Sequence, residues 1–250
     1  MKFLNEKSLK ALENLKTHRP QEDRFDVSER FAVLIALVAN SEGDLEVIIT
    51  SRSSKLRVHG GDSAFPGGKR DPVDMNLIAT ARREALEEIG LHPSASETLN
   101  ILTPVISLNG LMVTPVIAFC PDMTTLDLIS LFPNPGEVDA VFSAPLESFL
   151  SPAAGTHKHH DTNWLQSTFR VHYFKGCGAH NYILADEAKH RIQSGWTVYG
   201  FTAGLLIEVA SIAFRRSTDF AHLAPGQGFD LKDMAAWHTK TCGAAIRASL

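Results

Sequence analysis

The distribution of apolar and polar positions predicts paired strands near the start of the chain. Residues 30–40 form a nearly continuous apolar run, which is typical of a strand buried on both faces. A polar turn at residues 41–44 separates this run from residues 45–50, where apolar residues resume. The two segments are therefore predicted to form a hairpin. A polar, glycine-rich stretch then runs from residue 51 to residue 72.

The pattern becomes helical further along the chain. Residues 74–91 have helical periodicity that ends at Gly90, a good helix-stopping residue. Residues 101–108 and 111–119 read as strands, and Asn109-Gly110 between them is a strong hairpin signal. The other predicted elements are an amphipathic helix with leucines at 9, 12 and 15, a short helix or strand at 126–132, a strand at 138–142, a short helix at 145–150, strands at 169–174 and 182–185 with a Gly176-Cys177-Gly178 turn between them, and a helix at 202–216.

The length of 250 residues suits one large domain with additions at its ends. We expect an N-terminal helical arm over residues 1–26, a main domain over 27–216 and a C-terminal extension over 217–250. The chain contains no internal repeat and no low-complexity linker that would require a second domain.

Composition and charge narrow the classes of function. Apolar residues make up 44% of the chain and charged residues 21%, ordinary values for a globular protein. The formal net charge of -4 argues against general affinity for nucleic acid or anionic membranes. The net charge does not exclude a small phosphate-containing substrate, because bound cations reverse the local field at an acidic site.

The cysteines and the two ends of the chain bear on the compartment. Three cysteines, far apart, do not make a disulfide framework, so a reducing, intracellular and cytoplasmic location is expected. The N-terminus lacks the apolar core of a secretory signal, and no apolar stretch is long enough to span a membrane. The final Ala248-Ser249-Leu250 is a weak indication of a peroxisomal location.

Three carboxylates cluster within the predicted helix. Glu84, Glu87 and Glu88 have the spacing i, i+3 and i+4, which puts them on one helix face. Taken alone, three such residues are most often a solvated acidic surface. The turn just upstream, Phe65-Pro66-Gly67-Gly68-Lys69, changes that interpretation, because its glycines expose backbone groups to a ligand. Such a carboxylate-rich site suits Mg²⁺ or Mn²⁺.

Residues 68–91 resemble the Nudix box, in which Gly, five residues, Glu and seven residues precede Arg-Glu-x-x-Glu-Glu-x-Gly and an apolar residue. The matching positions are Gly68, Arg83, Glu84, Glu87, Glu88, Gly90 and Leu91. There are two departures. Asp74 stands where the box has its first Glu, and eight residues rather than seven separate it from Arg83. Both departures are shared by the coenzyme A diphosphatase subgroup.

A second segment is similar to the same subgroup. That subgroup carries a pattern Leu-Leu-Thr-x-Arg-Ser/Ala-x3-Arg-x3-Gly-x3-Phe-Pro-Gly-Gly ahead of the box. This chain keeps every spacing, with Ile48-Ile49-Thr50-Ser51-Arg52-Ser53, Arg57, Gly61 and Phe65-Pro66-Gly67-Gly68. The two segments together cover about forty residues of continuous similarity, which makes the resemblance highly specific.

The resemblance implies a fold, a reaction and a cofactor. The fold is an α/β/α sandwich in which a mixed sheet lies between helices, with the helix near residues 74–89 on one face and that at 202–216 on the other. The reaction is hydrolysis of the diphosphate of coenzyme A, and of its acyl thioesters, to 4'-phosphopantetheine and 3',5'-ADP. Mg²⁺ or Mn²⁺ is implied as cofactor, held by Glu84, Glu87, Glu88 and the Gly68 carbonyl.

The resemblance also suggests which residues meet the substrate. Arg52 and Arg57 are expected to approach its phosphates, including the 3'-phosphate of coenzyme A. Gly61, Gly67 and Gly68 are assigned with them to substrate binding. Phe65 is assigned there too, with a role as an apolar anchor of the loop equally open.

Glu137 lies just before a predicted strand and is a candidate general base or extra metal ligand. A structural capping role for this residue is equally open. Two functional alternatives also stand. One is a Nudix diphosphatase for another nucleotide, such as NADH or ADP-ribose. The other is a Nudix-fold binding protein without hydrolysis, which the retained box carboxylates disfavour.

Histidines gather at residues 157–160, followed by Asp161. Histidines this close in sequence rarely reach closed coordination around a metal when they lie in a loop. We therefore expect this segment to be a solvated loop.

Overall fold

The computed structural model describes residues 4–20, 29–107, 109–164, 167–179, 182–185 and 194–227. Residues 248–250, which carry the weak peroxisomal signal, lie outside this part, as does Cys242. The expected division at residues 26 and 216 stays a prediction, because 21–28 and 228–250 are not described. In the described part, no helix is both long and apolar enough to cross a membrane.

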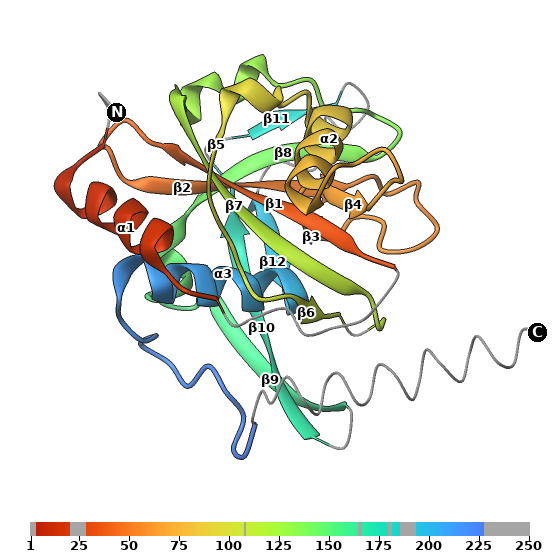
Figure 1. Ribbon diagram of the computed structural model, residues 1–250. Helices are drawn as coiled ribbons and strands as arrows, with labels where there is room; N and C mark the ends of the chain where they lie inside the picture. Colours follow the sequence, from red (N-terminus) through yellow and green to blue (C-terminus); the bar gives the residue numbers. More distant parts are fainter. Residues whose placement is uncertain are drawn as a thin grey trace, which may run out of the picture.

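The chain forms three α-helices, twelve strands and three short 3₁₀ helices within the described residues (Figure 1). In chain order they are α1 (Glu6–Thr17), β1 (Phe31–Ala39), β2 (Leu45–Arg52), β3 (Ser63–Ala64), β4 (Gly67–Lys69), α2 (Leu77–Ile89), η1 (Pro93–Ala95), β5 (Glu97–Ile101), β6 (Val105–Ile106), β7 (Met112–Thr124), η2 (Thr125–Ser130), β8 (Val138–Pro145), η3 (Leu146–Phe149), β9 (His157–Trp164), β10 (Ser167–Cys177), β11 (Tyr182–Leu184), β12 (Trp196–Tyr199) and α3 (Gly200–Phe214).

A mixed sheet forms the centre of the fold. Its main order is β11-β8-β2-β1-β7-β5, and the short strands β3, β4 and β6 pair with β2, β1 and β7. β1 and β7 run parallel, whereas the other pairings are antiparallel. The expected hairpin of β1 with β2 is confirmed, with Leu37 opposite Val47.

Both faces of β1 are covered, which explains its continuous apolar run. Ala32, Leu34 and Val38 point into a core shared with α2. Ile35 and Leu37 point into a second core shared with α1 and α3. The sheet therefore lies between α2 on one face and α1 with α3 on the other, and the expected α/β/α sandwich is confirmed (Figure 1).

α2 begins later than its periodicity predicts. Asn76 caps its N-terminus by accepting a hydrogen bond from the Ala79 amide at 2.9 Å, so the helix starts at Leu77 rather than residue 74. Gly90 ends it in a left-handed conformation, with φ of 70°, as a glycine allows. These two caps fix where the acidic residues of the helix lie along the sheet.

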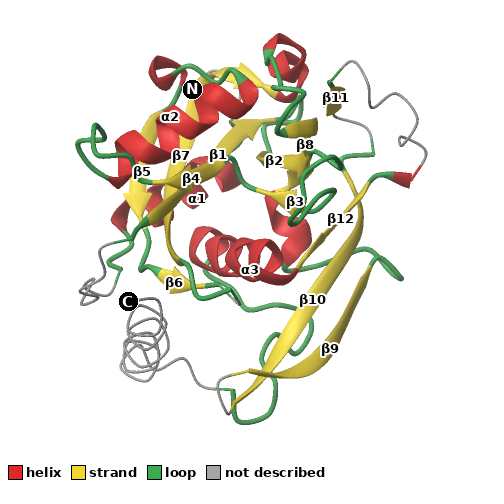
Figure 2. Cartoon of the chain, turned by 90° about the vertical axis from the view of Figure 1, so that its right-hand side faces the viewer, coloured by secondary structure: helices red, strands yellow, loops and turns green. Residues whose placement is uncertain are grey.

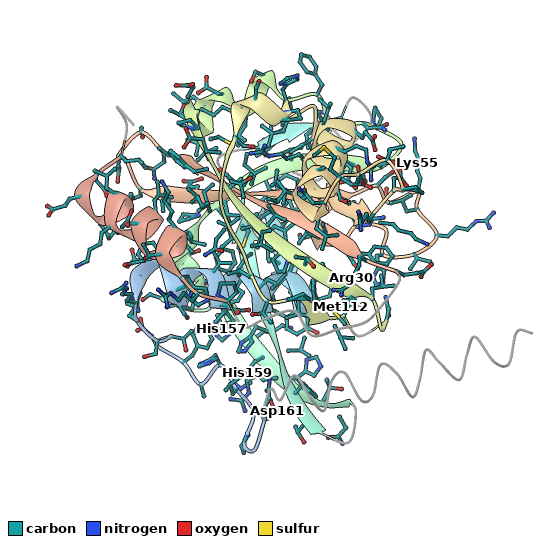
Figure 3. All side chains as sticks on the ribbon, in the orientation of Figure 1. Arg30, Lys55, Met112, His157, His159 and Asp161 are labelled. Atoms are coloured by element: carbon teal, nitrogen blue, oxygen red, sulfur yellow. The ribbon has the colours of Figure 1, made fainter. Side chains whose placement is uncertain are left out.

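A second sheet of order β12-β10-β9 adjoins α3 (Figure 2). The expected loop at residues 157–160 is wrong, because these residues begin β9, which pairs along its length with β10. His157, His159 and Asp161 alternate along one face of β9 (Figure 3). His157 packs against Phe220 with tilted rings whose centroids are 4.1 Å apart, and it shares a 3.0 Å hydrogen bond with His172. His159 and His160 are nevertheless exposed, so the expected loop is wrong but their contact with solvent is not.

Two other expectations need correction. The strand predicted over residues 101–108 is interrupted, because pairing with β7 is made by β5 and then by the two residues of β6. The strands predicted at 169–174 and 182–185 exist as β10 and β11, but they belong to different sheets. Gly176-Cys177-Gly178 therefore does not join paired strands. Cys120 and Cys177 are both free, and Cys120 is buried in the core.

α1 packs as part of the main core. Leu12 and Leu15 are buried among residues of the central strands and α3, while Leu9 is 41% exposed. The Asn14 side chain also donates to the Ala213 carbonyl of α3 at 2.8 Å. The N-terminal helix is thus joined to α3 by apolar contact and by a buried hydrogen bond.

We predict that Leu15→Ala lowers the free energy of unfolding by about 2–5 kcal/mol, because it opens a cavity where no solvent reaches. Leu9→Ala, on the same helix, is the matched control and should change it by less than about 0.5 kcal/mol. Urea denaturation monitored by circular dichroism measures both. Equal effects of the two substitutions would show that α1 is a loosely attached arm.

Candidate active site on α2

The glycine turn reaches α2 because β4 pairs with β1. Gly68 lies opposite Ala32 and Gly67 opposite Val33 in this pairing. A β-carbon on Gly67 would overlap the Ala32 carbonyl and the Val33 backbone. A β-carbon on Gly68 would overlap the carboxylate of Glu84. Gly67 is thus required by its close approach to a strand, whereas Gly68 leaves room for an acidic side chain.

Glu88 is the most buried of the three carboxylates, with 6% of the residue exposed. Its Oε2 accepts a hydrogen bond from the Gly67 amide at 3.2 Å, and Arg52 Nη1 lies 4.0 Å from its Oε1. The pKa of Glu88 is raised to about 8, chiefly by burial and to a smaller extent by nearby Glu84 and Glu137, while the Gly67 amide and Arg52 oppose the rise. A cation placed beside this group would favour its ionised form.

Glu84 lies beside Gly68, and its side chain is 17% exposed. Burial raises the pKa of Glu84, with smaller contributions from Glu87 and Glu137, while Arg83 opposes the rise. Glu84 and Glu88 are thus two partly desolvated carboxylates against one glycine turn. Their lone pairs and the Gly68 carbonyl are oxygen donors of the kind that hard divalent cations prefer.

Arg83 Nη1 lies 3.0 Å from Glu84 Oε1 and also pairs with Glu87. Glu87 Oε2 accepts a hydrogen bond from Arg83 Nη1 at 3.0 Å, and the Glu87 side chain is 53% exposed. In the described part of the chain, no three His, Cys, Asp or Glu side chains gather closely enough to hold an ion by themselves. The donors fit Mg²⁺ or Mn²⁺ in kind, and of the three expected carboxylates Glu84 and Glu88 are the pair placed at the glycine turn.

Asp74 has a structural partner. Its carboxylate receives two hydrogen bonds from Arg83, both at 3.1 Å, one from the Thr80 hydroxyl and one from the Asp71 amide. The Arg83 hydrogen bonds lower the pKa of Asp74 to about 2. Arg83 also donates to the Lys69 carbonyl at 3.0 Å. Asp74 and Arg83 therefore tie the loop after β4 to α2, a role that sequence spacing alone left undetermined.

The residues expected to bind substrate differ in their position and in their exposure. Arg52 ends β2 beside Glu88. Arg57 is exposed in the loop that follows, and Gly61, with φ of 81°, ends that loop. Phe65 is only 5% exposed and packs in the core with α1 and α3. Of its two open roles, the buried position favours that of loop anchor.

Glu137 lies in the loop before β8, close to both α2 and Arg52. The Asn134 amide donates to the Glu88 carbonyl at 2.9 Å, and the Ser53 amide donates to the Glu137 carbonyl at 2.8 Å. Its carboxylate influences Glu84 and Glu88 electrostatically. Glu137 is exposed, so its carboxylate is accessible to a substrate or to water.

Comparison with known proteins identifies the family. The model of the NUDIX domain matches residues 28–168, more than half of the chain. This chain belongs to the Nudix family. Among curated Nudix proteins, the mitochondrial Nudix hydrolase 15 of Arabidopsis thaliana is 40% identical over 203 residues, which are 81% of this chain and 65% of that protein.

Two further Nudix relatives cover different shares. The peroxisomal coenzyme A diphosphatase NUDT7 of Mus musculus is 45% identical over 125 residues, 50% of each chain. The uncharacterized Nudix hydrolase NudL of Klebsiella pneumoniae (strain 342) is 33% identical over 197 residues, 77% of this chain and 87% of that protein. This chain thus spans two thirds or less of the length of the plant and mouse relatives. These two are named for different compartments, so the location of this protein stays a prediction.

We predict different consequences for alanine at Gly67 and at Gly68 of this Nudix protein. Gly67→Ala should lower the free energy of unfolding by about 1–3 kcal/mol, because backbone atoms of β1 would have to move. Gly68→Ala meets only the flexible end of Glu84, so it should weaken Mn²⁺ binding about 10–100-fold with little loss of stability. Thermal unfolding and titration calorimetry separate the two effects. Equal destabilisation with unchanged Mn²⁺ affinity would contradict the assignment of Gly68.

We also predict that Asp74→Asn destabilises this Nudix protein in a pH-dependent way. Because the folded-state pKa of Asp74 is depressed, its contribution is fully present above the unfolded value near 3.8 and is lost as pH falls towards 2. The loss at pH 7 should be about 1–2 kcal/mol and should shrink as the pH falls below 3.8. Asp71→Asn, whose side chain is 57% exposed, is the control in denaturant titrations. An effect independent of pH would contradict this role.

Proposed function

We propose that this Nudix protein hydrolyses the diphosphate bond of coenzyme A, and of acyl-coenzyme A esters, to 4'-phosphopantetheine and 3',5'-ADP. One observation carries the proposal. Glu84 and Glu88 lie against the Gly67-Gly68 turn, and Arg52 lies 4.0 Å from Glu88. Acidic donors for a cation and a fixed positive charge for a phosphate thus occur at one place. This combination suits an anionic diphosphate better than a neutral substrate.

A divalent cation, when bound, supplies charge neutralisation of the diphosphate and a more acidic bound water. Glu84, Glu88 and the Gly68 carbonyl would hold it, with Glu87 as a further ligand, once Glu84 and Glu87 are released from Arg83. The chain itself keeps these donors in place. Arg83 and Asp74 fix the loop after β4, and the Gly67 amide orients Glu88.

Arg52 would meet the substrate's phosphates. Its guanidinium ends β2 next to Glu88, and its Nε is a buried donor with no hydrogen-bond partner in the described structure. A phosphate oxygen would satisfy such a donor, since arginine binds phosphate through two or more N–H groups. Arg57, exposed in the following loop, would reach the 3'-phosphate that distinguishes coenzyme A. The mouse relative, named as a coenzyme A diphosphatase, supports this choice of substrate.

Glu137 is our candidate for the group that accepts a proton from the attacking water. It is exposed and lies close enough to Glu84 and Glu88 to raise the pKa of each. A carboxylate that is accessible yet near the reacting bond meets the geometric requirement for a general base. The Ser53 amide, which donates to the Glu137 carbonyl, keeps the residue next to Arg52.

We predict that the purified protein cleaves coenzyme A when Mg²⁺ or Mn²⁺ is present. Glu88→Gln should lower kcat by more than about 100-fold, because it removes a charge that faces the cation. Glu97→Gln, exposed on β5, is the control and should leave turnover unchanged. Chromatography of the products, with dephospho-coenzyme A, NADH and ADP-ribose as competing substrates, measures both activity and preference.

Three results would contradict separate parts of this proposal. Unchanged turnover in both Glu84→Gln and Glu88→Gln would exclude the proposed cation site. Equal turnover of all four substrates would exclude coenzyme A as the preferred substrate while leaving a general Nudix diphosphatase. Binding of coenzyme A without turnover, with either cation present, would favour a non-hydrolytic binding protein.

A further inference from the structure

The loop of residues 53–61, here called the substrate loop, leaves the site at Arg52 and returns to it. The Gly61 amide donates to the Arg52 carbonyl, and the Arg52 amide donates to the Asp62 carbonyl, both at 2.9 Å. Ser54 begins the loop by donating its amide to Asp139 Oδ2 at 2.9 Å. Lys55 of this loop lies on the same side of the molecule as α2 (Figure 3). Both ends of the substrate loop are therefore fixed beside the acidic site.

The middle of the substrate loop is exposed and has an unusual backbone conformation. His59 has a φ of 58°, in the left-handed region that residues other than glycine rarely adopt. Such a conformation persists only where surrounding contacts hold it. Two side chains supply these contacts. Asp62 Oδ2 lies 2.8 Å from His59 Nδ1, and the side-chain nitrogen Nδ2 of Asn109 lies 2.8 Å from His59 Nε2.

Asp62 joins the substrate loop to a distant part of the chain. One carboxylate oxygen pairs with His59, and the other accepts a 2.5 Å hydrogen bond from the Tyr199 hydroxyl. Tyr199 lies 137 residues away in sequence. Burial and the adjacent Asp62 raise the pKa of Tyr199 to about 12, so its hydroxyl stays protonated and remains a donor.

Tyr199 is itself held firmly. Its ring stacks on Tyr173 with centroids 5.4 Å apart and planes within 5°. It immediately precedes α3, where the Thr202 hydroxyl donates to the Ser63 carbonyl at 3.0 Å. The Ser63 hydroxyl in turn donates to the Thr197 carbonyl at 3.0 Å. Tyr199, the partner of Asp62, thus lies at the junction of the second sheet with α3.

We propose that Asp62, with His59 and Tyr199, is a latch that positions the substrate loop for recognition of a terminal phosphomonoester. This rests on the proposed function, in which Arg57 of the same loop meets the 3'-phosphate of coenzyme A. The latch holds the backbone two residues from Arg57 in a conformation the loop does not adopt by itself. The three latch residues are positioning residues, because they act on the substrate through Arg57 rather than by contact.

Tyr199→Phe is the sharpest test, because it removes one hydroxyl and keeps the stacked ring. It should raise KM for coenzyme A about tenfold, the value of one hydrogen bond to a charged group, and change kcat less than about twofold. Turnover of dephospho-coenzyme A should be unaffected. Arg57→Ala should lower the ratio of kcat/KM for coenzyme A over dephospho-coenzyme A in the same direction. Tyr182→Phe, whose ring packs edge-on against Trp196, is the matched control.

The outcomes distinguish the latch from a structural role. Equal losses for both substrates in Tyr199→Phe would overturn the latch, because general destabilisation does not discriminate between them. Asp62→Asn should reproduce the selective loss, since it weakens both hydrogen bonds of the carboxylate, and an unchanged substrate ratio in that variant would also overturn the proposal.

A second measurement needs no substrate. Amide hydrogen exchange of the metal-free protein should be faster across residues 53–62 in Tyr199→Phe, with α2 and β1 unchanged, and unchanged exchange in that segment would overturn the latch. If the wild-type protein fails to cleave coenzyme A while this exchange difference is present, the proposed function fails and the latch stands.

Discussion

The close approach of the Gly67-Gly68 turn to α2 is the contact on which the site depends. Because Gly67 has no side chain, β4 can pair closely with β1. Because Gly68 has none either, there is room for the Glu84 carboxylate. The pairing brings the Gly67 amide to Glu88, which lies next to Arg52 at the end of β2. The two glycines thus bring a turn of the backbone against Glu84 and Glu88, which are partly buried there.

The acidic residues near α2 divide into two groups with opposite electrostatic behaviour. Asp74 is paired with Arg83, so its pKa falls to about 2 and its charge stabilises the folded loop. Glu84 and Glu88 are desolvated without full pairing, so their pKa values rise. Partial desolvation of like charges is unfavourable for the protein alone and becomes favourable when a cation binds. The structure therefore separates carboxylates that hold the fold from those suited to chemistry.

The residues proposed to act in bond cleavage and those proposed to select the substrate lie on different structural elements. The acidic residues are carried by α2, which is packed into a core and capped at both ends. The substrate loop connects β2 to β3, and hydrogen bonds of Asp62 with His59 and with Tyr199 hold its conformation. A site divided in this way would allow substrate preference to change without disturbing the proposed metal ligands. The second sheet, through Tyr199, contributes to that loop although it is remote from α2 in sequence.

The sequence by itself determined the elements whose cause is local. The apolar run of β1, its hairpin with β2, the helix ending at Gly90 and the grouping of glycine turn with acidic helix all follow from short-range patterns. Tertiary structure decided what depends on distant partners. Phe65 enters the core, and residues 157–160 form a strand because they pair with β10. The Asp62–Tyr199 hydrogen bond joins residues 137 positions apart, and no periodicity or spacing records such a contact.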